Sequence, residues 1–136
     1  MPAGYSKKSL PEKLGIKEGA RIAVLEPPQN YSSTLGSLPK GVLVLKKLQP
    51  QTDFIQFFAS KRVDLENIFS KLKTALATDG MLWISWPKKA SRMATDLDEN
   101  LVREIGLQHG LVDIKVCAVD DIWSGLKFVY RIKDRK

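Results

Sequence analysis

The sequence predicts a three-layer α/β sandwich with a mostly parallel sheet that ends in an antiparallel hairpin at one edge. Three observations predict it. Short continuous apolar runs recur along the chain, as in strands buried on both faces. Two segments with helical spacing separate the later runs. After Gly110 the pattern changes to strict alternation, which is typical of half-exposed antiparallel strands.

The first half of the chain is expected to supply the outer parallel strands. Its expected elements are a helix at 10–14, a strand at 21–26, a helical turn at 31–36, and strands at 42–45 and 53–58. The run Ser9-Leu10-Pro11-Glu12 is a capping box with proline in the first turn, so it begins the first helix. Pro27-Pro28 stops the first strand.

The second half is expected to place its central strand between two longer helices. Its expected elements are helices at 61–76 and 97–109, a strand at 81–86, and an alternating pair at 112–118 and 126–132. Ser60 and Asp96 are the predicted N-caps of the two helices. Thr78-Asp79-Gly80 is expected to end the first helix and to lead into the central strand, which stops at Pro87.

Length and composition predict a single domain over 1–136, with a basic arm at 1–8 and a solvated tail at 133–136. No apolar run reaches the roughly 18–20 residues that span a bilayer, and no apolar segment of a secretory signal follows the basic start. Cys117 has no cysteine partner. We therefore expect a cytoplasmic protein without a membrane segment.

The order of elements resembles the latter part of the class I methyltransferase fold. Leu76-Ala77-Thr78-Asp79-Gly80-Met81-Leu82-Trp83-Ile84 is similar to the entry of that fold's fifth strand, which a helix and an antiparallel hairpin follow. The chain is short for the full fold, so one strand–helix unit is expected to be missing from its front half. The resemblance implies a truncated Rossmann-like sandwich.

The cofactor site of that fold is not predicted. A dinucleotide or S-adenosylmethionine site needs a glycine-rich turn after the first strand, and this chain has Glu26-Pro27-Pro28-Gln29-Asn30 there. The second strand ends in Lys46-Lys47 instead of an acid. The cofactor is therefore left unknown, and a divergent S-adenosylmethionine-dependent methyltransferase is kept as an alternative function.

Basic residues follow three of the predicted parallel strands, whose carboxyl ends share one rim of the sheet. We expect an anion site there, formed by Lys88, Lys89, Arg92, Lys61 and Lys46. Trp86 and Trp123 are candidates for stacking on a ligand ring. The alternatives are a solvated loop for the lysines and a core role for the tryptophans.

No catalytic or metal site is predicted. His109 precedes Gly110 at a helix end and lacks a nucleophile or ligand partner in the sequence, and no P-loop, Gly-x-Ser-x-Gly or His-Glu-x-x-His motif occurs. The leading hypothesis is a non-catalytic module that binds a small anionic ligand or an acidic protein, in keeping with a net charge of +7. Nucleic acid is a less favoured partner, the oligomeric state is left open, and an interaction module that pairs through the sheet edge at 126–132 is a further alternative.

Three stretches together look like a family of small bacterial proteins known only as a domain of unknown function. They are Leu14-Gly15-Ile16-Lys17-Glu18-Gly19-Ala20-Arg21, Trp86-Pro87-Lys88-Lys89-Ala90-Ser91 and Trp123-Ser124-Gly125-Leu126-Lys127-Phe128-Val129. The resemblance spans nearly the whole chain. It implies a bacterial cytoplasmic domain and carries no reaction, cofactor or site residues.

Overall fold

The computed structural model describes residues 8–135, so most of the predicted arm and the last residue of the tail lie outside it. In chain order its elements are α1 (Leu10–Leu14), β1 (Arg21–Leu25), α2 (Tyr31–Leu35), β2 (Leu43–Val44), β3 (Thr52–Phe58), α3 (Arg62–Ala75), β4 (Leu76–Pro87), η2 (Lys89–Ser91), α4 (Glu99–Gln108), β5 (Leu111–Ala118), β6 (Trp123–Tyr130) and η3 (Ile132–Asp134).

One sheet of six strands runs through the molecule in the order β2-β1-β3-β4-β6-β5. The first four strands are parallel, and β6 is antiparallel to both β4 and β5. The usual order of a doubly wound sheet is 3-2-1-4-5-6. Without its two outermost strands that order becomes 2-1-4-5, which has the arrangement of the parallel part of this sheet, and β2 is at the edge, as expected if one strand–helix unit is missing from the front half.

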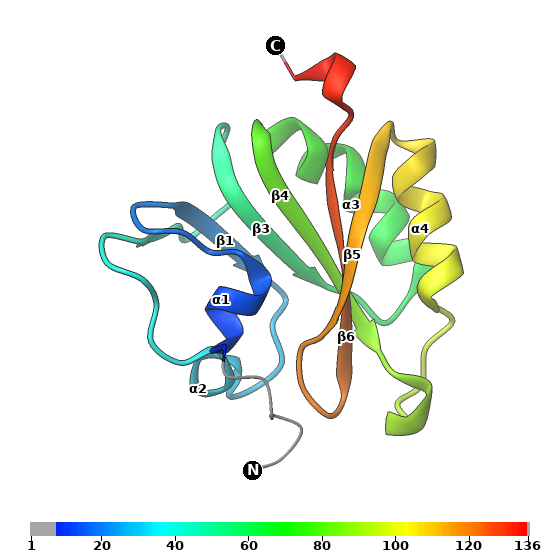
Figure 1. Cartoon of the computed structure of the whole chain (residues 1–136). Helices are drawn as coiled ribbons and strands as arrows, with labels where there is room; N and C mark the ends of the chain where they lie inside the picture. The colour runs from blue at the N-terminus through cyan, green and yellow to red at the C-terminus, as the bar shows by residue number, and fades with distance from the viewer. Residues whose placement is uncertain (1–7, 136) are drawn as a thin grey trace.

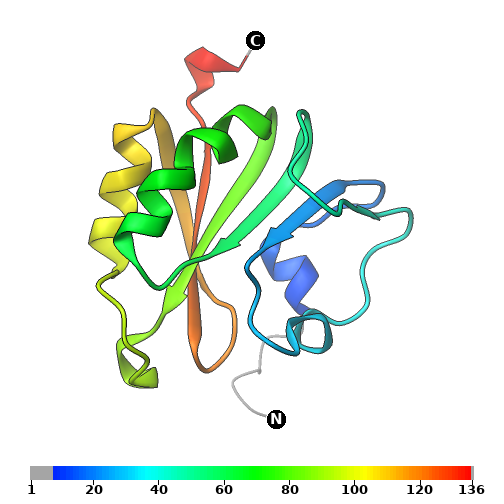
Figure 2. The same cartoon turned by 180° about the vertical axis from the view of Figure 1, so that it is seen from behind.

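Helices cover the sheet on both faces, which makes three layers. In Figure 1, α1 and α2 lie in front of the β1 side of the sheet, and Figure 2 shows α3 and α4 on the opposite face. The α3/α4 side encloses the larger apolar core, which includes Leu65, Phe69 and Phe128. The α1/α2 side encloses a second core around Phe54, Phe58 and Trp83.

Strand β4 is buried on both faces, as predicted for the central strand. Leu82 and Ile84 belong to the core under α3 and α4, while Trp83 belongs to the core under α1. Trp83 is fully buried, and its Nε1 donates to the carbonyl oxygen of Leu14 at 2.8 Å. This bond fixes the end of α1 to the middle of the sheet.

The second predicted strand is wrong in length and burial. Strand β2 has only two residues, and Leu43 and Val44 are each 54% exposed. The apolar run predicted a strand covered on both faces, but β2 is the edge of the sheet. The strand–helix unit that would cover it is the one this chain lacks.

The boundary between α3 and β4 also differs from the prediction. The helix ends at Ala75 and the strand begins at Leu76, so Thr78-Asp79-Gly80 lies within β4. The register moves from Thr52↔Leu76 to Phe54↔Met81, so the strand carries a bulge there. A side chain at Gly80 would meet the carbonyl oxygen of Asp53 at 2.8 Å, which requires glycine at this position.

The helix caps differ from the predicted ones. Lys61, not Ser60, is the N-cap of α3 and supplies no side-chain bond. The carboxylate of Asp96 accepts from the Arg62 backbone N–H at 2.7 Å, so Asp96 closes α3 from the loop before α4. Helix α4 is capped by Asp98, whose Oδ1 accepts from the Leu101 N–H at 2.8 Å.

The antiparallel hairpin closes the sheet as predicted, with β5 as its edge. The suggested pairing edge at 126–132 is wrong, because β6 is hydrogen-bonded on both sides and Ile132 belongs to η3. Part of the predicted tail is ordered: the Arg135 side chain donates to the carbonyl of Tyr130 at 2.9 Å. Within 8–135, no helix is long and apolar enough to cross a membrane.

The contact between α4 and β6 gives a stability prediction. A Cβ atom at Gly106 would lie 2.0 Å from the Phe128 ring, and both residues are buried. Gly106→Ala is therefore expected to lower the free energy of unfolding by about 1–3 kcal/mol, although alanine is the better helix former. Urea unfolding measures it, with the exposed Glu104→Ala as the control.

Adding Phe128→Leu to the Gly106→Ala variant removes ring atoms from the clash. The second substitution should then cost less in the Gly106→Ala background than in the wild type. If Phe128→Leu lowers the free energy of unfolding equally in both backgrounds, the Phe128 ring does not restrict the size of the side chain at position 106.

Candidate functional site

The candidate site is an open cavity at the carboxyl ends of β1 and β3. The strand order reverses between these strands, since β2 lies on one side of β1 and β3 on the other. Doubly wound sheets bind ligands at this point. The cavity has a volume of about 520 Å³, within the range of small-molecule sites. We call it the switch-point cavity; its lining includes Glu26, Phe58, Ser60, Asp64, Asn67 and Trp123.

Three segments bring its polar side chains together. Glu26 directly follows β1 and has a φ of 53°, a left-handed conformation that costs a residue with a side chain about 1–3 kcal/mol. Ser60 lies between β3 and α3. Asp64 and Asn67 lie three residues apart in the first turns of α3, so they share one side of that helix.

These four polar side chains have no partner among residues 8–135. Within 8–135, the carboxylates of Glu26 and Asp64 take part in none of the ion pairs and accept no hydrogen bond. The Asn67 amide is equally unpaired, and Ser60 uses only its backbone carbonyl, which accepts from the Thr95 hydroxyl. Two carboxylates, an amide and a hydroxyl are therefore available to a ligand.

The apolar part of the cavity is aromatic. Phe58 and Trp123 contact each other edge to face, with ring centroids 5.1 Å apart, and both line the cavity. Tyr31 packs against the far side of Phe58, at 4.7 Å between centroids. An aromatic wall beside unpaired carboxylates suits a ligand that carries positive charge and a ring.

A buried chain of hydrogen bonds supports this wall from below. The Tyr31 hydroxyl donates to Gln56 Oε1 at 2.6 Å, and Gln56 Nε2 donates to Ser85 Oγ at 3.0 Å. Gln56 and Ser85 are fully buried. The chain therefore fixes α2, and with it the Pro27-Pro28 turn, against β3 and β4.

The predicted anion site is only partly assembled. Lys88 and Lys89 line a neighbouring cavity of about 490 Å³ together with Trp86, Asp96, Asp98 and Glu99. Arg92, Lys61 and Lys46 are exposed and line neither this cavity nor the switch-point cavity. The N-terminus of α3 already holds the Asp96 carboxylate. Anion binding by the five basic residues stays a prediction.

The two candidate stacking residues lie on opposite faces of the sheet. Trp86 packs in the core under α3 and α4, and Trp123 packs in the core under α1 and α2. They are only 5% and 7% exposed. Each borders a different cavity, so they cannot stack on the same ring from one side, and only Trp123 lies in the switch-point cavity.

Other titratable residues have local roles. His109 stacks on Phe69, and its Nδ1 lies 2.9 Å from the Ile105 carbonyl oxygen at the end of α4. The Cys117 thiol is buried. In the described part of the chain no cluster of three or more His, Cys, Asp or Glu residues could hold a metal ion.

Sequence reasoning missed Glu26, Asp64 and Asn67 as site residues. The signal was present: an acid follows the first strand, and two polar residues with helical spacing open the helix after the third. The predicted site included only the basic residues that follow the strands and left out the acidic ones.

Comparison with known proteins supports the fold. A proposed type 11 methyltransferase from Sulfolobus solfataricus superimposes with a TM-score of 0.65 over 92% of this chain and 91% of its own, at 17% identity. An S-adenosylmethionine-dependent methyltransferase from Aquifex aeolicus gives 0.58 over 86% and 85%, at 18% identity. Magnesium protoporphyrin IX methyltransferase from Synechocystis gives 0.57 over 90% and 78%, at 12% identity.

The sequence itself matches no family model and no curated protein. The resemblance to a bacterial family of unknown function therefore stays a prediction. At these identities the solved structures establish the fold alone. The chain has a methyltransferase-like Rossmann fold, as its sequence predicted.

The Tyr31 hydrogen bond leads to a prediction of pH dependence. Burial raises the pKa of the Tyr31 phenol, and its hydrogen bond with Gln56 opposes this only in part. The folded protein therefore keeps the proton above pH ~10, where the unfolded phenol loses it. Tyr31 should contribute stability below pH ~10 and lose it at higher pH, by about 1.4 kcal/mol per pH unit.

The test compares the wild type with Tyr31→Phe in urea between pH 8 and pH ~11. At pH 8 the variant should be less stable by about 1–3 kcal/mol, because Gln56 loses its buried donor. Above pH ~10 this gap should shrink, because only the wild type carries the Tyr31 phenol, which loses its proton more readily in the unfolded chain. Groups that are present in both proteins do not change the gap. A gap that stays constant with pH would contradict the buried, neutral phenol.

Proposed function

We propose that the chain binds S-adenosylmethionine in the switch-point cavity and acts as a divergent methyltransferase. The observation that carries the proposal is the set of four unpaired polar side chains in that cavity, beside Phe58 and Trp123. The fold shared with methyltransferases supports it.

The charge of the cavity favours this ligand over an anion. S-adenosylmethionine carries a positive sulfonium and a positive amino group, and its ribose has two hydroxyl donors. The unpaired carboxylates of Glu26 and Asp64 would accept from the ribose or attract the cationic groups. A phosphate would instead meet two negative side chains and no lysine or arginine among the residues that line the cavity.

The turn after β1 changes how such a ligand would be held. A glycine loop offers backbone N–H donors, but Pro27 and Pro28 have none, and the Tyr31 N–H donates to the Pro28 carbonyl. The carboxylate of the ligand would therefore rely on the Ser60 hydroxyl and the Asn67 amide. Bound S-adenosylmethionine supplies an electrophilic methyl group, and the aromatic wall would exclude water from it.

Calorimetric titration with S-adenosylmethionine tests the proposal. Glu26→Gln and Asp64→Asn are each expected to weaken binding about tenfold, since each removes one charge-assisted contact. Lys88→Ala/Lys89→Ala is the matched control at the neighbouring cavity and should bind as the wild type does. S-adenosylhomocysteine should bind more weakly, because it lacks the sulfonium charge.

No heat at millimolar ligand would exclude the proposed cofactor. Equal weakening by the carboxylate variants and by the lysine control would exclude the proposed site. Loss of binding in the Lys88→Ala/Lys89→Ala variant alone would place the ligand in the other cavity.

A further inference from the structure

A second feature lies on the α1 side of the sheet, away from the carboxyl ends of β1 and β3. Three lysines lie close together there: Lys17 in the loop after α1, Lys115 in β5 and Lys127 in β6. Lys115 Nζ donates to the Lys13 carbonyl oxygen at 3.3 Å. Lys127 Nζ lies 3.7 Å from where a Cβ atom of residue 15 would be, at the end of α1. We call Lys17, Lys115 and Lys127 the lysine cluster.

The cluster places like charges against one another. Lys115 and Lys127 are direct partners in the register of β5 and β6, an arrangement that destabilises an antiparallel pair. Partial burial lowers the pKa of the Lys127 ammonium, and the charges of Lys115 and Lys17 lower it further. A lysine that only solubilises the surface would not need a position that disfavours its charge.

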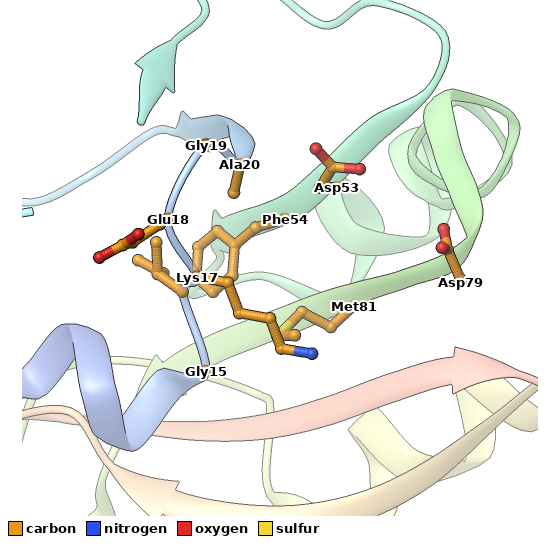
Figure 3. A pocket seen from close by; sticks show the side chains of 10 residues that line it. Gly15, Lys17, Glu18, Gly19, Ala20, Asp53, Phe54, Asp79 and Met81 are labelled. Atoms are coloured by element: carbon orange, nitrogen blue, oxygen red, sulfur yellow. The ribbon is translucent and has the colours of Figure 1, made fainter. Parts of the chain in front are cut away.

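No carboxylate of residues 8–135 forms an ion pair with the cluster. All three ion pairs involve Arg62 or Arg103 instead. The closest acidic candidates by sequence are engaged or turned away: Glu12 bonds to Ser9, and Figure 3 shows Glu18 pointing to the opposite side from the Lys17 ammonium. The positive charge is therefore uncompensated within the described chain.

A small cavity borders the cluster. It has a volume of about 230 Å³, and the loop 15–20, Phe54 and Met81 form most of its lining. Figure 3 shows the Lys17 side chain extending along Met81 at the cavity, with Asp53 and Asp79 on the far side. Asp53 already accepts from the Arg21 backbone N–H at 2.8 Å. The lysines thus lie at one side of the recess and extend onto the open surface of β5 and β6.

We propose that the lysine cluster binds the phosphate groups of an extended ligand, either a phosphodiester chain or a free oligophosphate. Lysine ammonium groups are compact, strongly hydrated cations that bind phosphate as point charges. A row of them from the loop after α1 across β6 and β5 matches successive phosphates better than one compact anion. The site shares no residue with the switch-point cavity.

Two probes at low salt test the proposal and separate the sources. Fluorescence anisotropy follows a labelled 12-nucleotide single-stranded RNA, and calorimetry follows inorganic tripolyphosphate. Binding of the RNA, with or without tripolyphosphate, would show that the cluster accepts a phosphodiester chain, and binding of tripolyphosphate alone would identify a free oligophosphate. With three lysines engaged, log K for the RNA should fall with log salt with a slope of about −2.1.

Substitutions assign the binding to the cluster. Lys17→Ala/Lys115→Ala removes two exposed side chains and should weaken binding at least tenfold at low salt, with the RNA slope falling to about −0.7. Lys127→Met keeps the apolar stem and should weaken binding as well. Lys71→Ala/Lys133→Ala is the control, with the same change in net charge on other exposed surfaces, and should retain both the affinity and the slope.

The proposal is overturned if neither probe binds the wild type, or if the control loses as much affinity as the cluster variant. Titration of the same variants with S-adenosylmethionine keeps the two proposals separate. The cluster variants should leave that binding unchanged, so failure of one proposal does not affect the other.

Discussion

Burial of β4 on both faces is the constraint on which the rest of the structure depends. Trp83 and Ser85 face α1 and α2, while Leu82 and Ile84 face α3 and α4, and every other element covers or extends this strand. The Trp83 indole must also satisfy its N–H in a dry core, and the Leu14 carbonyl does so. A five-residue helix that would not be stable alone is thereby held on the sheet.

The turn after β1 shows how the same fold can present a different site. Two prolines remove the backbone donors of a glycine loop, but the turn is still held rigidly, because Tyr31 anchors α2 through Gln56. Donors and acceptors at the carboxyl ends of the strands are then side chains. The side chains are mostly acidic around the switch point and basic on the α1 side. The net charge of +7 is therefore the sum of two surfaces of opposite charge.

Much of the fold could be predicted from the sequence, because buried strands and amphipathic helices leave direct patterns. The mostly parallel sheet and the antiparallel hairpin both followed from such patterns. The exposure of β2 did not, since an apolar run looks alike whether or not a layer covers it. The predicted N-caps were wrong for a similar reason. Asp96 precedes α4 in the sequence, but its carboxylate accepts a hydrogen bond from the first turn of α3.

The site was less predictable than the fold. The residues that follow each strand suggested a basic site. A site is made by residues from several elements, however, and the sequence alone does not say which of them lie together. Glu26 and Asp64 are 38 positions apart and come together only because β1 and β3 are neighbours. The lysine cluster depends in the same way on the pairing of β5 with β6.

The two edges of the sheet have a consequence for association in solution. An edge strand exposes unpaired backbone groups and can recruit another chain. Here one edge, β2, is only two residues long, and the other, β5, is interrupted by a register shift between Asp113 and Lys115. Neither offers a long, flat template. The exposed apolar side chains at both edges therefore lie on short or irregular strands, which are poor templates for pairing with another chain.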